Sequence, residues 1–297
     1  MSYQGIFVVD KPVGAPSQAA ISQLRRTFGM KKVGHCGTLD PLASGVLPVM
    51  LGSATKVCDL LMDHEKTYTA TVRLGLETDS EDITGEVLRR FEGTLPSFAE
   101  FREAAEKFVG EIDQVPPMYS ALKKDGQKLV DLARKGVVIE RPARKVTIHS
   151  IHAYEKDGKF LLDVRCSRGT YIRTLCADIG KALGCGACME ALRRTSVGQF
   201  DLSQAVTLEE LRAMTAEQAA ERIIPVDRVF SYLPEFRLPA FFEKLYRNGE
   251  RISLRKIGLK AGAGDRFRLY GEDGFYAIGE VREEDGECRL CPGILFA

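Results

Sequence analysis

The sequence has little that would mark a membrane, metal-binding or nucleotide-binding protein. The apolar run in MSYQGIFVVDK ends after four residues, which is too short for a signal-peptide core or a membrane span, so we expect a cytoplasmic protein. No GxxxxGK is present, and no GxGxxG follows a strand-like run, so nothing supports a site for a nucleoside triphosphate or a dinucleotide. An enzyme with this sequence is expected to work without a cofactor.

Metal-ligating residues are few and poorly spaced. Of the four histidines, His149 and His152 are the nearest to a pair, and in a strand they would point to opposite faces. Eight cysteines without a secretory signal favour reduced thiols packed inside rather than a disulfide framework. Two C-x-x-C units lie too far apart for a zinc ribbon: Cys185 with Cys188, and Cys288 with Cys291. We therefore expect no metal site, with zinc as a minor alternative.

The net charge of +1 gives no general attraction to nucleic acid, but the charges are unevenly distributed. The segment from residue 123 to 145 holds eight basic residues and three acidic ones. The basic residues are Lys123, Lys124, Lys128, Arg134, Lys135, Arg141, Arg144 and Lys145. This segment could be a phosphate-binding face or an ordinary solvated one, and at this point both interpretations stay open.

Strand and helix patterns mix irregularly along the chain. Residues 6–9, 67–74 and 159–166 are strand-like, Ser17 could cap a helix, and Ser97 and Thr207 each begin a capping box. No repeat is visible and helices do not alternate with strands, which favours an α+β fold with a mixed, mainly antiparallel sheet. Beyond residue 235, short strand-like runs separated by glycines predict a small closed β unit. We therefore expect a catalytic domain at 1–235 and a β-rich domain at 236–297.

Asp40 lies in the irregular glycine-rich loop GHCGTLDPLASG, which could hold a carboxylate at the edge of a cleft, although such a residue is more often a turn former. The other candidate carboxylates, Asp79 and Asp82, are expected in an exposed polar loop, so no second carboxylate is expected beside Asp40. A lone carboxylate suggests a nucleophile rather than one member of an acid–base pair. Arg173 is expected in the first turn of a helix, where the helix dipole opposes a cation and a nearby anion would compensate. Asp40 is a candidate for that anion; a solvent-exposed Arg173 is the alternative.

Four blocks of sequence, in order, resemble the TruB family of bacterial tRNA pseudouridine-55 synthases. They are GHCGTLDPLASGVLPVMLGSATK, KTYTATVRLG, PPMYSALKKDGQKLVDLARKG and CSRGTYIRTLCADIGKALGCGA. The resemblance implies an enzyme that isomerises uridine 55 in the T loop of tRNA, on the pseudouridine synthase fold. Pro16 departs from the family, which usually has a hydroxyl residue there, and proline removes a backbone donor.

The resemblance also assigns roles to single residues. Asp40 would be the catalytic aspartate, Tyr68 would stack on the uracil and could accept the proton from C5, and Arg173 would pair with Asp40. His35 would fill the space that the flipped base leaves, and Leu192, which in isolation looks like any helical leucine, would form an apolar wall. Lys11 is grouped with the substrate-binding residues, and support of the Asp40 loop is its expected use.

The resemblance makes the basic segment, at about 120–145, an RNA-gripping insertion that includes Lys123, Lys124, Lys128 and Arg144. The tail would be a PUA-type RNA-binding domain, and both would hold phosphates rather than read sequence. The expected partner is the T arm of tRNA, bound by a monomer with no protein partner and no membrane. Two alternatives stay open: an RNA-binding protein that has lost turnover, and a related synthase that acts on another RNA.

Overall fold

The computed structural model describes residues 3–62, 64–120, 122–124 and 126–296. Within them, one large mixed sheet has the main strand order β14-β1-β3-β12-β4-β11-β10-β7, with β2 beside β3 and β13 beside β12. Its strands are β1 (Gly5–Lys11), β2 (Val33–His35), β3 (Ala43–Leu51), β4 (Lys66–Leu74), β7 (Gly110–Gln114), β10 (Arg144–Lys156), β11 (Lys159–Cys166), β12 (Ala187–Val197), β13 (Phe200–Asp201) and β14 (Val206–Thr207). Only the β1–β14 and β3–β12 pairs are parallel in this sheet. The predicted α+β fold with a mainly antiparallel sheet is confirmed.

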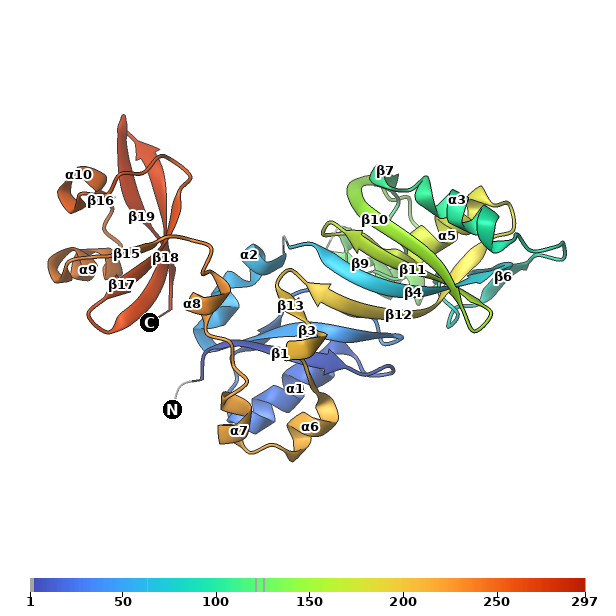
Figure 1. The fold of residues 1–297 in the computed structure, drawn as a ribbon, viewed down its shortest axis with the longest axis horizontal. Coiled ribbons are helices and arrows are strands. Elements are labelled where there is room, and N and C mark those ends of the chain that lie inside the picture. Colours follow the sequence, from blue (N-terminus) through green and yellow to red (C-terminus); the bar gives the residue numbers. More distant parts are fainter. Residues whose placement is uncertain (1–2, 63, 121, 125, 297) are drawn as a thin grey trace.

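Helices cover the sheet in two groups (Figure 1). The helices of this part are α1 (Ser17–Phe28), α2 (Cys58–Met62), α3 (Phe98–Glu106), α4 (Leu129–Ala133), α5 (Ile172–Ala182), α6 (Leu208–Ala213), α7 (Ala216–Ala220) and α8 (Val226–Val229), with 3-10 turns η1 (Gly52–Val57) and η2 (Leu202–Gln204). Helix α1 packs with α6 and α7 beside β1 and β3, whereas α3 and α5 pack at the β10–β12 end. Both predicted capping boxes are present, at Ser97 and Thr207. Ser17, in contrast, is not a cap, because Pro16 holds that position without a side-chain bond.

The side chains of β1 point alternately to the two faces of the sheet and so belong to two separate cores. Phe7 and Val9 belong to the main core, and Ile6 and Val8 belong to a second core on the other face of the sheet. The second core also contains Ile278 and Phe296 from the C-terminal part, so apolar burial joins the two parts of the chain. No helix in the described ranges is long and apolar enough to cross a bilayer. The cytoplasmic location stays a prediction.

The C-terminal part forms a second, β-rich domain in which the described strands have the order β15-β17-β18-β19-β16. The elements are β15 (Glu235–Arg237), α9 (Ala240–Arg247), β16 (Ile252–Ser253), α10 (Leu254–Ile257), β17 (Arg266–Gly271), β18 (Gly274–Glu284) and β19 (Glu287–Leu295). The pairing order is open, so the prediction of a closed unit is wrong. The short end strands β15 and β16 belong to opposite edges of this sheet. Lys56 and Ser53 donate hydrogen bonds to the carbonyls of Leu295 and Phe296, at 2.7 and 3.0 Å, and so tie η1 to the end of this domain.

Two small hairpins extend from the catalytic part. The first pairs β5 (Leu76–Thr78) with β6 (Val87–Arg90), and the second pairs β8 (Lys123–Lys124) with β9 (Gln127–Lys128) inside the basic segment. The second hairpin leads directly into α4. The basic segment is therefore a hairpin and a short helix placed between β7 and β10.

Candidate active site

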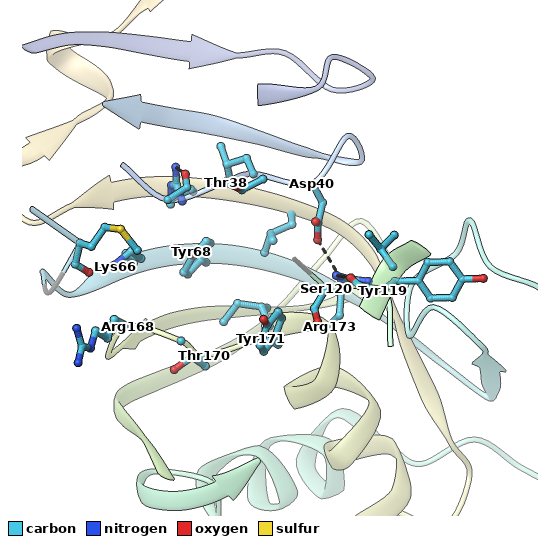
Figure 2. A pocket seen from close by; sticks show the side chains of 18 residues that line it. Thr38, Asp40, Lys66, Tyr68, Tyr119, Ser120, Arg168, Thr170, Tyr171 and Arg173 are labelled. Carbon is cyan, nitrogen blue, oxygen red and sulfur yellow. Dashed lines mark hydrogen bonds and ion pairs between the residues drawn. The ribbon is translucent and has the colours of Figure 1, made fainter. Parts of the chain in front are cut away.

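Asp40 lines a pocket of about 490 Å³ that opens where the large sheet meets the loop before β3. The walls come from the loop at 37–40, from β4 and β12, from residues 119–120 and from the start of α5. Figure 2 shows Asp40 and Arg173 joined at one end of the pocket, with Lys66 and Arg168 toward the other. The pocket therefore collects segments from five separate regions of the sequence, and it includes the three residues predicted to be catalytic.

The loop that carries Asp40 is fastened at several points. Ser17, buried at the start of α1, bonds both the amide and the carbonyl of Leu39 at 2.9 Å. Gly14 donates its amide to the Pro41 carbonyl at 2.7 Å, and Ala43 donates to the Asp40 carbonyl at 3.1 Å. Ser17 thus serves the loop rather than the helix, which explains why it does not cap α1.

Lys11 is fully buried beneath this loop. Its amine donates to the carbonyls of Ala15 and Pro12, at 2.7 and 2.9 Å, and reaches that of Pro41 at 3.5 Å. Burial lowers the pKa of Lys11 to about 8, against the opposing charge of Asp40. With its donors directed at three carbonyls, Lys11 supports the loop, and its grouping with the substrate contacts is not supported by this placement.

Replacing Lys11 with methionine is expected to lower the free energy of unfolding by about 1–3 kcal/mol, because three backbone carbonyls lose a charged donor that is itself fully buried. Turnover should fall as well, since the loop that presents Asp40 loses an anchor. Urea unfolding and single-turnover assays measure the two effects, with Lys31→Met, a change at an exposed position, as the matched control. Equal stability of the two variants would contradict the anchoring role.

Arg173 is 4% exposed and lies in the first turn of α5. Its Nε is 3.0 Å from Oδ2 of Asp40, so the predicted ion pair is present. Nη1 donates to the Ser80 carbonyl at 3.0 Å and Nη2 to the Tyr119 carbonyl at 2.8 Å. The guanidinium is thereby fixed in one orientation, and the Asp40 carboxylate, 41% exposed, stays open to the pocket on its other side.

The expectation that Asp82 lies in an exposed loop is wrong. Asp82 is 5% exposed, and its Oδ2 is 3.7 Å from Nη1 of Arg173, on the far side of the guanidinium from Asp40. Its Oδ1 accepts hydrogen bonds from Ser80 Oγ and Thr84 N, both at 2.9 Å. Asp79, only partly exposed, accepts a bond from the Tyr119 hydroxyl at 2.8 Å. Sequence reasoning missed this second carboxylate because the loop is polar, and only its folding around Arg173 buries it.

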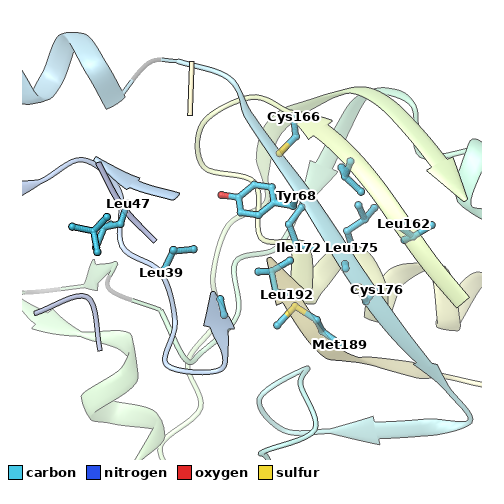
Figure 3. Close-up of a cluster of buried hydrophobic side chains, with 14 of the residues drawn as sticks. Leu39, Leu47, Tyr68, Leu162, Cys166, Ile172, Leu175, Cys176, Met189 and Leu192 are labelled. Atoms are coloured by element: carbon cyan, nitrogen blue, oxygen red, sulfur yellow. The ribbon is translucent and has the colours of Figure 1, made fainter. Parts of the chain in front are cut away.

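Tyr68 is 7% exposed and lies on β4 near Ile172 and Leu192, with its hydroxyl directed away from that apolar cluster (Figure 3). Burial raises the pKa of Tyr68, while the positive charge of Arg194 acts in the opposite direction. The phenol is therefore protonated at neutral pH. Its ring forms one wall of the pocket.

Leu192 is also a wall residue, 8% exposed, but it belongs to strand β12 and not to a helix. It pairs with Ala70 on β4 and Ala43 on β3. Two positions further along the same strand, Arg194 lines the pocket on the same face. Arg194 was not among the predicted site residues. Assigning ALRRT to a strand would have placed Arg194 on the same face as Leu192, because side chains alternate between the two faces of a strand.

His35 lies at the end of β2, outside the set of residues that line the pocket. Burial lowers the pKa of His35, and the charge of Arg194 lowers it further. Its ring is therefore neutral at neutral pH, and its buried Nδ1 has no hydrogen-bond partner in the described structure. A neutral ring suits stacking better than phosphate binding, and the predicted RNA contact stays a prediction.

The basic segment is only partly described at the level of side chains. Lys124 is exposed and donates to the Glu140 carbonyl at 3.3 Å, and Arg144 is exposed at the start of β10. The side chains of Lys123 and Lys128 lie outside what the structure describes. Burial raises the pKa of Tyr171, a pocket residue, and the charge of Arg144 acts in the opposite direction, which places Arg144 near the pocket.

Six of the eight cysteines are buried thiols, as the sequence predicted, and these include Cys185 and Cys188 of the first C-x-x-C unit. Burial raises the pKa of Cys188 to about 11, which makes a thiolate ligand unfavourable there. Among the described residues no cluster of three or more His, Cys, Asp or Glu side chains could hold a metal ion.

The chain is similar to known proteins of one family. The family model for the N-terminal domain of TruB family pseudouridylate synthases matches residues 25–172, and the model for the C-terminal domain of tRNA pseudouridylate synthase B matches residues 173–231. The tRNA pseudouridine synthase B of Aromatoleum aromaticum is 44% identical over 97% of this chain and 91% of its own length. That of Alkaliphilus oremlandii is 45% identical over 95% of this chain and 94% of its own.

Solved structures show the same fold. The structure of a Cbf5-Nop10-Gar1 complex matches with a TM-score of 0.73 and 28% identity, over 99% of this chain and 85% of the other. An archaeal box H/ACA sRNP Nop10-Cbf5 complex matches with a TM-score of 0.71 and 26% identity, over 99% of this chain and 86% of the other. With family models and close relatives that together span nearly the whole chain, the protein belongs to the TruB family of pseudouridylate synthases and is an isomerase.

Proposed function

We propose that this enzyme converts uridine 55 in the T loop of tRNA to pseudouridine, with Asp40 as the nucleophile and the target base flipped out of its stack. The names of its relatives supply the substrate class, tRNA. The observation that carries the proposal is the half-exposed Asp40 carboxylate, held 3.0 Å from the buried Arg173 at the edge of a pocket of about 490 Å³. A pocket of this size accommodates a nucleoside.

During the reaction the uracil is detached from the sugar, and the enzyme must hold it in the pocket. The bond from C1' to N1 breaks and leaves its electron pair on the uracil; the base turns, C5 bonds to C1', C5 loses a proton and N1 gains one. Atoms and electrons balance within the substrate, so the step requires no oxidant or reductant. Asp40 could add to C1' or to C6, or assist removal of a proton from the sugar, and we leave these routes open.

The other pocket residues have roles that follow from their placement. Arg173 keeps the Asp40 carboxylate aimed into the pocket, because the guanidinium itself is fixed by two backbone carbonyls. The ring of Tyr68 and the side chain of Leu192 would hold the uracil between apolar surfaces. Because burial raises the pKa of Tyr68, the phenol holds its own proton, and it could accept the C5 proton only if its own proton left the oxygen in the same step.

Access to this pocket requires the base to leave the T loop. Unstacking costs a few kcal/mol, roughly, which contacts to the rest of the T arm would offset. We assign His35 to the vacated space, and Lys124, Arg144 and the other basic residues of the 120–145 insertion to the phosphates. We also assign residues 1–235 to catalysis and 236–297 to a PUA-like domain that holds RNA.

We expect the enzyme to act as a monomer without protein partners. The matched Cbf5 chains were solved in complexes with Nop10, or with Nop10 and Gar1. A monomer elution volume that does not change during turnover would support this expectation.

Binding of tRNA should weaken steeply with salt, because contacts to phosphates release counterions. Lys124→Ala and Arg144→Ala are each expected to weaken binding and to reduce the slope of log K against log salt by about 1. Fluorescence titration of a T-arm minihelix at several salt concentrations measures the slope, with Lys31→Ala, at an exposed position outside the insertion and the C-terminal domain, for comparison. If the slope is unchanged in both insertion variants, Lys124 and Arg144 do not contact the phosphates of the RNA.

Release of tritium from C5 of labelled uridine tests the reaction directly. We expect release from a T-arm minihelix at a rate well above that from ribosomal RNA fragments. Binding without release from any RNA would favour a protein that has lost turnover. Faster release from ribosomal fragments would assign the enzyme to another substrate.

A further inference from the structure

Arg194 is an unusual residue in this pocket, because it is a buried cation that no carboxylate pairs with. It is 1% exposed, and in the part of the chain that the structure describes no acidic side chain forms an ion pair with it. Its neighbour Arg193 pairs with Asp10 at 2.7 Å, and Arg173, the other buried arginine of the pocket, pairs with Asp40. Arginine is almost never fully buried unless it is paired, since removal of its charge from water is costly. The pocket therefore contains one cation that lacks a direct anionic partner.

Two of the three guanidinium nitrogens of Arg194 are held by backbone carbonyls. Nε donates to the Val46 carbonyl on β3 at 2.8 Å, and Nη2 donates to the Gly37 carbonyl at 3.1 Å. Nη1 has no hydrogen-bond partner among the described residues, and it lies beside Gly37, where an added Cβ would be 3.5 Å from it. Both Gly37 and Arg194 line the pocket. The guanidinium is thus fixed in one place, with one nitrogen left for a ligand.

Strand pairing places Arg194 beside the two residues proposed to hold the uracil. Arg194 and Tyr68 are direct partners in the β4–β12 ladder, so their side chains lie on the same face of the sheet. Leu192, two positions before Arg194 on β12, lies on that face as well. The charge of Arg194 opposes the rise that burial causes in the pKa of Tyr68, which agrees with this closeness. A base held between Tyr68 and Leu192 would therefore have Arg194 as a neighbouring cation.

The detached uracil carries a negative charge. When the bond from C1' to N1 breaks, its electron pair passes to the base and spreads over N1, O2 and O4, whichever of the three routes Asp40 takes. The charge is consumed when C5 bonds to C1', after which C5 loses a proton and N1 gains one. A fixed cation in a site shielded from water stabilises such a developing charge far more than the same cation would in water. The charge of Arg173 is already balanced by Asp40 and Asp82, which leaves Arg194 for this role.

We propose that Arg194 is a further catalytic residue: its guanidinium, fixed by the carbonyls of Val46 and Gly37, stabilises the negative charge on the detached uracil. The inference rests on the proposed function, because it concerns the base that the pocket would hold. It predicts that the charge of Arg194 acts on the chemical step and not on RNA binding. An arginine that only anchored the loop would act through its shape, and one that held a phosphate would act on RNA affinity.

Single-turnover rates on a T-arm minihelix at saturating enzyme test the role of the charge. Arg194→Met is expected to lower the rate about 100-fold, while the Kd for RNA stays within about twofold. Arg194→Lys keeps the charge but cannot make the same carbonyl bonds, and its rate should lie within about tenfold of wild type. Arg193→Met removes the adjacent charge, which does not line the pocket, and is the matched control with an expected wild-type rate. If the methionine variant does not fold, as judged by circular dichroism, Arg194→Gln is the second neutral variant, with the same expected loss.

A substrate with a better leaving group separates the charge of Arg194 from its anchoring bonds. Fluorine at C5 withdraws electrons and stabilises the uracil anion, so the base needs less help from a cation. With 5-fluorouridine at the target position, Arg194→Met should slow the reaction by no more than about tenfold, against about 100-fold with uridine. Chromatography of the digested RNA measures loss of the target nucleoside for both substrates. If the wild-type enzyme leaves the fluorinated RNA unchanged, the comparison of the lysine variant with the neutral variant decides alone.

Four results would overturn the inference. They are a wild-type rate for the neutral variants, a lysine variant as slow as the neutral ones, an equal loss of rate on the two substrates, and a loss confined to RNA affinity, which would assign Arg194 to a phosphate. Failure of the wild-type enzyme to turn over any RNA would overturn the proposed function and this inference together. Turnover by wild type with any of the four results would overturn the inference alone.

Discussion

Turnover is expected to be lost when Asp40 is replaced by asparagine, to below about one part in ten thousand of the wild-type rate, while RNA binding is retained. The amide has nearly the same shape as the carboxylate but lacks the charge and nucleophilicity that the reaction requires. The loop should keep its position, because Lys11, Ser17 and Gly14 hold it by contacts that do not involve the Asp40 side chain. Tritium release with excess enzyme, and a Kd for the T-arm minihelix, measure the two quantities.

Asp59→Asn is the matched control for this experiment, since Asp59 is an exposed residue of α2 that does not line the pocket. It should have wild-type turnover. Residual turnover by Asp40→Asn within about tenfold of wild type would exclude Asp40 as the nucleophile. A large loss of RNA affinity in the same variant would point instead to a role in binding.

Replacing Arg173 with alanine is expected to slow turnover by about a thousandfold and to lower the free energy of unfolding by about 3 kcal/mol. Without the guanidinium, the buried Asp82 carboxylate loses its cation, and the carbonyls of Ser80 and Tyr119 lose their donors. Asp40 also loses the group that orients it. Single-turnover rates and urea unfolding, at a temperature where the variant is folded, measure both effects.

Arg165→Ala is a suitable comparison, because Arg165 forms an exposed ion pair with Glu65 and should contribute little to stability. Arg173→Lys should recover part of the lost turnover, since a cation remains but cannot make the same set of bonds. A near-wild-type rate for Arg173→Ala would mean that the ion pair with Asp40 is not needed for the reaction.

Local signals in the sequence predicted the elements well. The strand at 159–166 coincides with β11, and the capping boxes at Ser97 and Thr207 begin α3 and α6. These features depend on residues only a few positions apart, where side-chain alternation and end-capping bonds act directly on the backbone. Leu192 was misassigned to a helix because a short apolar and basic run has no clear period.

The sequence by itself determined the mixed fold, the glycine-rich loop that carries Asp40, and the membership of a family that points to Asp40, Tyr68 and Arg173. Only the tertiary structure decided how these residues are held. It buries Asp82 against Arg173, turns Ser17 and Lys11 to the loop, and places Arg194 against Tyr68. Each of these contacts joins segments that are distant in sequence, or side chains that strand pairing places on one face. Whether a charge can be buried depends on the partners that the fold brings to it, and no local sequence pattern specifies those partners.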